Sequence, residues 1–222
     1  MQNIKELLDL CQKIAGITIY ELANRLNIAC PASLKNNKGW IGQLLELYLG
    51  AKSYNLPIPD FPELGVELKT IPVNMRTLTP TESTYICTAP LNNLTIDWEK
   101  SIVYKKLAKI LWIPIESSPK LSLYNRRIGK SFLWQPNEQQ AIILKNDWYE
   151  LTEMLGLGKL QLLSAKYGRY LQVRPKAANC KTTLISYKTI DGGYIKTVAR
   201  GFYLRASFTK QILAEHFINT CY

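Results

Sequence analysis

The chain has 222 residues, with 28 Lys and Arg against 17 Asp and Glu, which gives a formal net charge of +11. Its 47% hydrophobic and 20% charged residues are typical of a globular domain and exclude a disordered tail, a collagen or a coiled coil. No apolar run approaches the roughly 20 residues that span a bilayer, and the first residues alternate charged and apolar side chains, so we expect a cytoplasmic protein without membrane contact.

The first predicted elements are helices. Apolar residues recur at helical spacing in residues 4–14, and two further helices are predicted at 18–27 and 40–49. Residues 55–65 contain three prolines and a glycine, which exclude a helix there. We therefore expect a loop that leads into a strand at 65–73.

Strands and helices then follow one another irregularly. Runs of β-branched and aromatic residues predict strands at 84–90, 109–116, 131–136, 169–175 and 201–208. Helices are predicted at 98–108, 137–155 and 209–219. Because the pattern lacks regular βαβ alternation, we expect an α/β fold with a mixed β-sheet flanked by helices, in a single domain over residues 1–222.

The positive charge is concentrated in residues 159–210, which contain eleven Lys or Arg and one acid, Asp191. Basic residues there alternate with aromatic and small ones. This composition suits a polyanion, so we expect contact with DNA that weakens steeply with salt, although a solvated basic face is the alternative.

The histidine and cysteine content restricts the possible chemistry. The five cysteines are scattered and lack C-x-x-C spacing, which indicates neither a disulfide framework nor a zinc site. The single histidine, His216, excludes a two-histidine metal site, and its amphipathic surroundings favour a packing or surface role over a catalytic one. Chemistry must rest on carboxylates, lysines and a metal ion.

The predicted strand at 65–73 has a charged face. Side chains alternate along a strand, so Glu67 and Lys69 share one face, and the preceding loop can turn the Asp60 carboxylate back beside it. Two carboxylates, with the Leu68 carbonyl as a further oxygen donor, suit Mg²⁺, which would activate water for phosphodiester hydrolysis. Lys69 would orient that water or stabilise charge on the phosphate. The alternative is an exposed Glu67–Lys69 ion pair without function.

Four segments, residues 38–51, 60–73, 173–180 and 199–208, closely resemble the MutH family of methyl-directed DNA mismatch-repair endonucleases. The resemblance implies a restriction endonuclease-like fold with two lobes around a DNA-binding cleft, with the catalytic lobe mainly within 38–115. It also implies Mg²⁺-dependent nicking of the unmethylated strand at hemimethylated GATC sites. Mn²⁺ or Ca²⁺ would occupy the same site, Ca²⁺ without activity.

The resemblance implies roles for individual active-site residues. Asp60 and Glu67 resemble the family's metal ligands, with the Leu68 carbonyl beside them, and Lys69 its catalytic lysine. Glu46 resembles an additional active-site carboxylate, and Lys106 a further active-site lysine, although a second lysine precedes it directly.

The resemblance also implies a set of DNA contacts. An arginine can donate two hydrogen bonds to guanine, and a methyl group on adenine N6 lies in the major groove, where a ring can detect it by steric contact. Phosphate contact for Arg174 and core packing for Tyr203 are the alternatives. The implied DNA-binding residues are Lys38 and Gly39 in a loop, Arg174, Pro175 and Lys176 in one motif, and Tyr203.

The family resemblance further implies a monomer that acts on double-stranded DNA and is activated by a MutL-like ATPase after MutS finds a mismatch. Two other functions are open from the sequence. One is a type II restriction endonuclease that cuts both strands, which requires a dimer or two binding events. The other is a non-catalytic DNA-binding module in which Asp60, Glu67 and Lys69 are surface charges.

Overall fold

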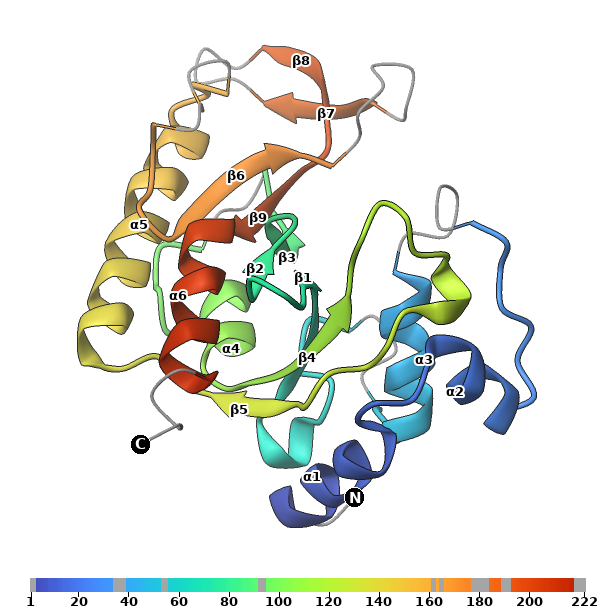
Figure 1. Cartoon of the computed structure of the whole chain (residues 1–222). Coiled ribbons are helices and arrows are strands. Elements are labelled where there is room, and N and C mark those ends of the chain that lie inside the picture. The colour runs from blue at the N-terminus through green and yellow to red at the C-terminus, as the bar shows by residue number, and fades with distance from the viewer. Residues whose placement is uncertain are drawn as a thin grey trace. The chain divides into compact units, whose positions relative to one another are not determined.

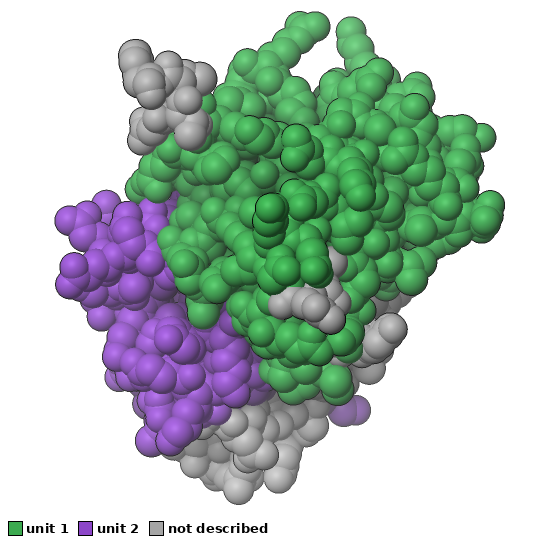
Figure 2. All heavy atoms as spheres, turned by 90° about the horizontal axis from the view of Figure 1, so that it is seen from below, with its two compact units in different colours: residues 1–82, 108–135, 210–222 green, residues 83–107, 136–209 purple. Residues whose placement is uncertain are grey.

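The computed structural model describes residues 3–33, 39–52, 56–91, 95–160, 163, 166–176, 184–188 and 193–217. The chain divides into two compact units (Figure 2): unit 1 comprises residues 1–82, 108–135 and 210–222, and unit 2 comprises residues 83–107 and 136–209. The single endonuclease domain over 1–222 stays a prediction. In the described part of the chain, no helix combines the length and the apolar character that crossing a membrane requires.

Unit 1 begins with the three predicted helices, α1 (Ile4–Ile14), α2 (Ile19–Arg25) and α3 (Trp40–Leu49). Polar side chains define where the first two begin. The Asn3 side chain accepts a hydrogen bond from the Glu6 backbone, and Thr18 and Glu21 form a reciprocal capping box. Helix α3 ends at Gly50, which adopts the left-handed conformation with φ 71°.

The sheet of unit 1 is mixed, as predicted. Its strands are β1 (Glu67–Asn74), β2 (Thr79–Pro80), β4 (Ile110–Glu116) and β5 (Phe132–Trp134), in the order β2-β1-β4-β5. Strands β1 and β4 are parallel, and the two outer pairs are antiparallel. The two-residue strand β2 was not predicted, because so short a segment has no detectable alternation. The single-turn helices η1 (Pro62–Leu64) and η2 (Leu123–Asn125) also belong to unit 1.

Helices α1, α2 and α3 lie against one face of this sheet (Figure 1). The two faces carry different side chains. On one face, Leu68 pairs with Leu111, and both are buried in the core formed with α1, α2 and α3. The other face carries Glu67 and Lys69, and the parallel register places Trp112 beside Lys69. The charged face of β1 is therefore the face that α1–α3 do not cover.

Unit 2 contains an antiparallel sheet and its helices. The elements are β3 (Thr84–Thr88), α4 (Ile102–Leu107), α5 (Glu138–Gly156), β6 (Leu171–Pro175), β7 (Leu184–Lys188), β8 (Tyr194–Val198), β9 (Arg200–Leu204) and α6 (Ala206–Phe217), which continues into unit 1. The sheet order is β3-β9-β6, a separate hairpin pairs β7 with β8, and α5 packs against β6.

Two predictions for these elements need correction, and two strands were missed. The strand predicted at 201–208 ends at Leu204, because the Arg205 carbonyl accepts hydrogen bonds from the backbone of Phe208 and Thr209 and so begins α6 earlier than predicted. Helix α4 is shorter than the predicted 98–108, because the Ser101 hydroxyl accepts from the Tyr104 backbone and caps its start. Strands β7 and β8 were not predicted.

Candidate active site and reading face

A tight turn brings Asp60 back to the start of β1. Phe61 and Val66 exchange backbone hydrogen bonds across the turn, at 2.8 and 3.2 Å. Between them, η1 is followed by Gly65 with φ 62°, a conformation that glycine adopts without steric cost. Asp60 is 6% exposed, and its carboxylate accepts a hydrogen bond from the Leu68 backbone at 2.8 Å. Asp60 thus lies beside β1, as the turn residues predict.

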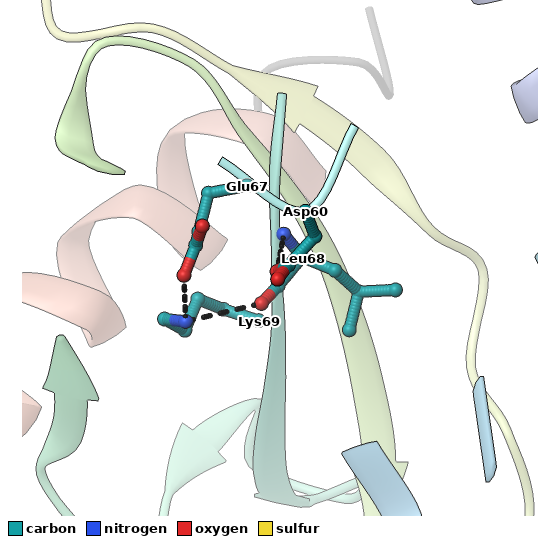
Figure 3. A network of polar contacts seen from close by, with 4 residues as sticks. All are labelled: Asp60, Glu67, Leu68 and Lys69. Atoms are coloured by element: carbon teal, nitrogen blue, oxygen red, sulfur yellow. Dashed lines mark hydrogen bonds and ion pairs between the residues drawn. The ribbon is translucent and has the colours of Figure 1, made fainter. Parts of the chain in front are cut away.

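Glu67 and Lys69 form a buried polar contact on one face of β1 (Figure 3). The Lys69 ammonium donates to Glu67 Oε1 and, at 3.2 Å, to the Leu68 carbonyl. The side chains are 1% exposed for Glu67 and 16% for Lys69, so the alternative of an exposed ion pair is wrong. The free energy lost when these two charges leave water offsets much of the free energy that their attraction provides. The contribution of the pair to stability therefore does not explain why it is buried.

The donor atoms at this position fit a hard divalent cation. The Asp60 and Glu67 carboxylates and the Leu68 carbonyl supply oxygen only, the donor type that Mg²⁺ and Ca²⁺ prefer. In the described ranges, no group of three or more His, Cys, Asp or Glu side chains is placed to hold a metal ion. A cation held here would complete its coordination with water and substrate oxygens, which is usual for Mg²⁺.

Glu46 lies in unit 1, on the helix that contacts β1. Its half-buried carboxylate turns back along α3, since a Cβ on Gly42 would lie 3.9 Å from Glu46 Oε1. The end of α3 is tied to the active-site turn, because the Lys52 backbone donates to the Asp60 carbonyl at 3.0 Å. The structure thus couples this helix to the turn that carries Asp60.

The remaining predicted residues of the active site and of the loop are on other elements. Lys106 is on α4 in unit 2 and is half-buried, whereas the adjacent Lys105 is exposed. Gly39 precedes α3 with φ 93°, in the left-handed region. Lys38 lies outside the described residues.

One face of the unit 2 sheet carries three of the six predicted DNA-binding residues, Arg174, Lys176 and Tyr203. The β6–β9 register pairs Gln172 with Tyr203 and Arg174 with Gly201, and alternation puts Lys176 on the same side. The opposite face is apolar and buried, and Pro175 alternates toward it although it is exposed. We call the polar side the reading face, defined by Ser83, Tyr85, Thr88, Gln172, Arg174, Lys176, Gly201 and Tyr203.

Cations and aromatic rings alternate across the reading face. The Arg174 guanidinium lies 5.8 Å from the Tyr203 ring centroid, and its Nη1 donates to the Ser83 hydroxyl at 3.4 Å. The Tyr203 and Tyr85 rings meet edge to face at 5.3 Å, and the Lys176 ammonium lies 4.9 Å from the Tyr85 centroid. Such contacts restrict the arginine and lysine side chains before any ligand binds.

Gly201 permits this packing of rings. A Cβ at this position would lie 2.8 Å from Tyr85 Cε2, 3.2 Å from Tyr203 Cε2 and 3.1 Å from the Cys87 carbonyl. Any side chain would displace the rings. Sequence analysis identified neither this role nor Tyr85, which lies on this face because it pairs with Tyr203 across β3 and β9.

A buried carboxylate fixes the start of β6. The two oxygens of Asp147, on α5, accept hydrogen bonds from three consecutive backbone N–H groups, those of Arg169, Tyr170 and Leu171, at 2.6–2.8 Å. Arg205 donates to the carbonyl of Gly168 just before them at 3.0 Å. These bonds set the register of the strand that presents Arg174.

Comparison with known proteins identifies close relatives. The family model described as DNA mismatch repair enzyme MutH matches residues 49–147. The DNA mismatch repair protein MutH of Vibrio campbellii is 45% identical over 98% of this chain and 96% of its own length. The MutH proteins of Vibrio vulnificus and Escherichia coli are 47% and 46% identical, over 97% and 96% of this chain and 95% and 93% of their own lengths.

Proposed function

This chain belongs to the MutH family of DNA mismatch-repair endonucleases, and we propose that it nicks the unmethylated strand of hemimethylated GATC sites with Mg²⁺ as its cofactor. It is a phosphodiester hydrolase that acts on DNA and depends on a divalent metal ion. The observation that carries the proposal is the buried arrangement of Asp60, Glu67 and Lys69 around the Leu68 backbone.

In the proposed mechanism, Asp60 and Glu67 hold the divalent ion with the Leu68 carbonyl, and Glu46 is the additional active-site carboxylate. The ion supplies Lewis acidity and a more acidic bound water. The backbone bond from Leu68 orients Asp60, and Lys69, which contacts two of the donor oxygens, stabilises charge on the phosphate. Lys106 is proposed as a second lysine that acts on the phosphate.

The reading face is proposed to recognise the bases. Arg174 donates to guanine O6 and N7, while Tyr203 detects a methyl group on adenine N6 in the major groove. The contact between the Arg174 guanidinium and the Tyr203 ring supports this role, because it restricts the arginine side chain before DNA binds. Pro175, Lys176, Lys38 and Gly39 are proposed as further DNA contacts.

We propose that the enzyme acts as a monomer and is activated by a MutL-like ATPase, which responds to MutS at a mismatch. One active-site arrangement in one chain cuts one strand, which is what strand-directed repair requires. A restriction endonuclease that cuts both strands would need a second copy on the same site.

The test uses end-labelled duplexes with one GATC site in unmethylated, hemimethylated and fully methylated forms, incubated with Mg²⁺, Ca²⁺ or EDTA. We expect nicks only in unmethylated strands, only with Mg²⁺, and stimulation by a MutL-like partner with ATP. Cutting of fully methylated DNA, or double-strand breaks by a dimer, would contradict the proposed specificity. Binding without cutting under all conditions would contradict the assignment of the chain as an endonuclease.

A further inference from the structure

The edge of the reading face carries a polar contact that the proposed function does not use. Lys176 Nζ donates to Thr88 Oγ1 at 3.0 Å, and the Tyr85 hydroxyl lies 3.0 Å from the same oxygen. The Lys176 ammonium also lies 4.9 Å from the Tyr85 ring centroid. One threonine hydroxyl therefore joins a cation and an aromatic side chain that also contact each other.

Thr88 reaches these side chains only because β3 contains a bulge. In a regular strand, residues three apart point to opposite faces. The pairing of β3 with β9 shifts between Tyr85 and Cys87, so that Tyr85 pairs with Tyr203 and Thr88 with Gly201. Both partners belong to the reading face. The bulge thus turns Thr88 toward the same side as Tyr85, as bulges beside functional sites often do.

The hydroxyl group is what makes this contact possible. An ammonium group only donates hydrogen bonds, so Thr88 Oγ1 accepts from Lys176. The oxygen has a second lone pair and one proton of its own, either of which serves the Tyr85 hydroxyl. Valine has the same shape and strand preference as threonine but offers neither group.

We infer that Thr88 is a positioning residue for DNA recognition, because its hydroxyl holds Lys176 and the Tyr85 ring in one arrangement at the edge of the reading face. A free lysine side chain loses much rotamer freedom when it is fixed against a phosphate. Fixing it beforehand reduces that loss on binding. The inference rests on the proposed function, since it requires that the reading face contacts DNA.

The experiment measures equilibrium binding of a GATC duplex in Ca²⁺ by the full chain and four variants: Thr88→Val, Thr88→Ser, Lys176→Met and the double variant Thr88→Val/Lys176→Met. We expect Thr88→Val to bind about three- to tenfold more weakly and Thr88→Ser, which keeps the hydroxyl, within about twofold of the wild type. The double variant should bind no more than about twofold more weakly than Lys176→Met, because Thr88 acts through Lys176.

Additive losses in the double variant would overturn the inference, and they are also what a folding defect in Thr88→Val would produce. Wild-type binding by Thr88→Val or by Lys176→Met, or a loss in Thr88→Ser equal to that in Thr88→Val, would overturn it too. None of these results affects the nicking assay. A wild-type chain that shows no preference for GATC would instead contradict the proposed function itself, so the two failures are distinguishable.

Discussion

The Asp60 carboxylate accepts a hydrogen bond from the Leu68 backbone at 2.8 Å, and this bond closes the turn before β1 from one end to the other. The hydrogen bond places the Asp60 carboxylate next to the Leu68 backbone, whose carbonyl accepts a hydrogen bond from Lys69. One side chain therefore has two separable tasks, to hold the turn and to offer negative charge to a cation.

Substitution of Asp60 separates these tasks. In Asp60→Asn, the amide oxygen can still accept from Leu68 while the charge is lost, so nicking should fall at least about 100-fold with a nearly unchanged melting temperature. In Asp60→Ala, the buried N–H also loses its partner, which should cost about 1–3 kcal/mol of unfolding free energy. Single-turnover nicking and thermal denaturation measure the two effects. Equal activity of Asp60→Asn and the wild type would exclude Asp60 as a ligand.

Lys69→Met should lower the rate of the cutting step by about 100- to 1,000-fold, because the ammonium stabilises charge on the phosphate. Binding of the GATC duplex in Ca²⁺ should change little. The matched control is Lys120→Met, an exposed lysine that no prediction places at the active site, which should cut at the wild-type rate. A loss in Lys69→Met that appears only in DNA affinity would assign Lys69 to binding rather than to catalysis.

Arg174→Ala should reduce discrimination between GATC and a one-base variant by about 1–3 kcal/mol, the contribution of a bidentate contact to guanine. Lys166 is an exposed residue in the same basic segment, and Lys166→Ala should weaken the binding of all duplexes to the same extent. Competition binding at two salt concentrations checks both. If Arg174→Ala weakens the binding of every duplex equally, Arg174 contacts phosphate rather than guanine.

Gly201→Ala should displace the Tyr85 ring on the reading face, because the alanine Cβ would lie 2.8 Å from Tyr85 Cε2. We expect weaker GATC binding and little change in metal-dependent cutting at saturating DNA. In a Tyr85→Ala background, most of the added loss should disappear, since the main clash is removed. An unchanged effect in that background would show that the Cys87 carbonyl, not the ring, limits this position.

The surroundings of His216 indicate that the stability of the protein, rather than its catalysis, depends on the protonation of this residue. Its ring stacks on Phe132 at a centroid distance of 4.1 Å. Burial, and to a smaller extent the charge of Lys130, lowers the pKa of His216 below its ordinary value. The unfolded chain therefore binds this proton more readily, so stability is complete above the ordinary histidine pKa near 6.5 and declines as the pH falls toward the lowered value.

The variant His216→Gln should show a smaller decrease in melting temperature than the wild type between about pH 7.5 and pH 5.5. Its nicking rate at neutral pH should match that of the wild type, because the proposed mechanism does not use His216. An unaltered pH dependence of melting would assign the acid sensitivity to other groups.

Much of the fold could be predicted because its signals are local. Helical spacing predicts α1 and α3, and the apolar run at 109–116 predicts β4, which is buried almost throughout. The shared face of Glu67 and Lys69 follows from strand alternation alone.

Other features depend on contacts between distant segments or on irregular backbone, which a pattern cannot reveal. The bulge in β3 reverses the alternation after Tyr85, so the sequence gives no indication that Thr88 and Tyr85 share a face. The end of β9 is likewise set by the backbone of Arg205, which begins α6 within a run that resembles a strand.

The central claim is that a divalent cation binds at Asp60 and Glu67, and it can be tested by location. Fe²⁺ in place of Mg²⁺, with ascorbate and peroxide, cuts a polypeptide near the bound ion, and mass spectrometry maps the cuts. We predict cleavage within or beside residues 60–69, suppressed by excess Mg²⁺ and absent from Glu67→Gln. Cleavage confined to other segments, or undiminished in Glu67→Gln, would contradict the account.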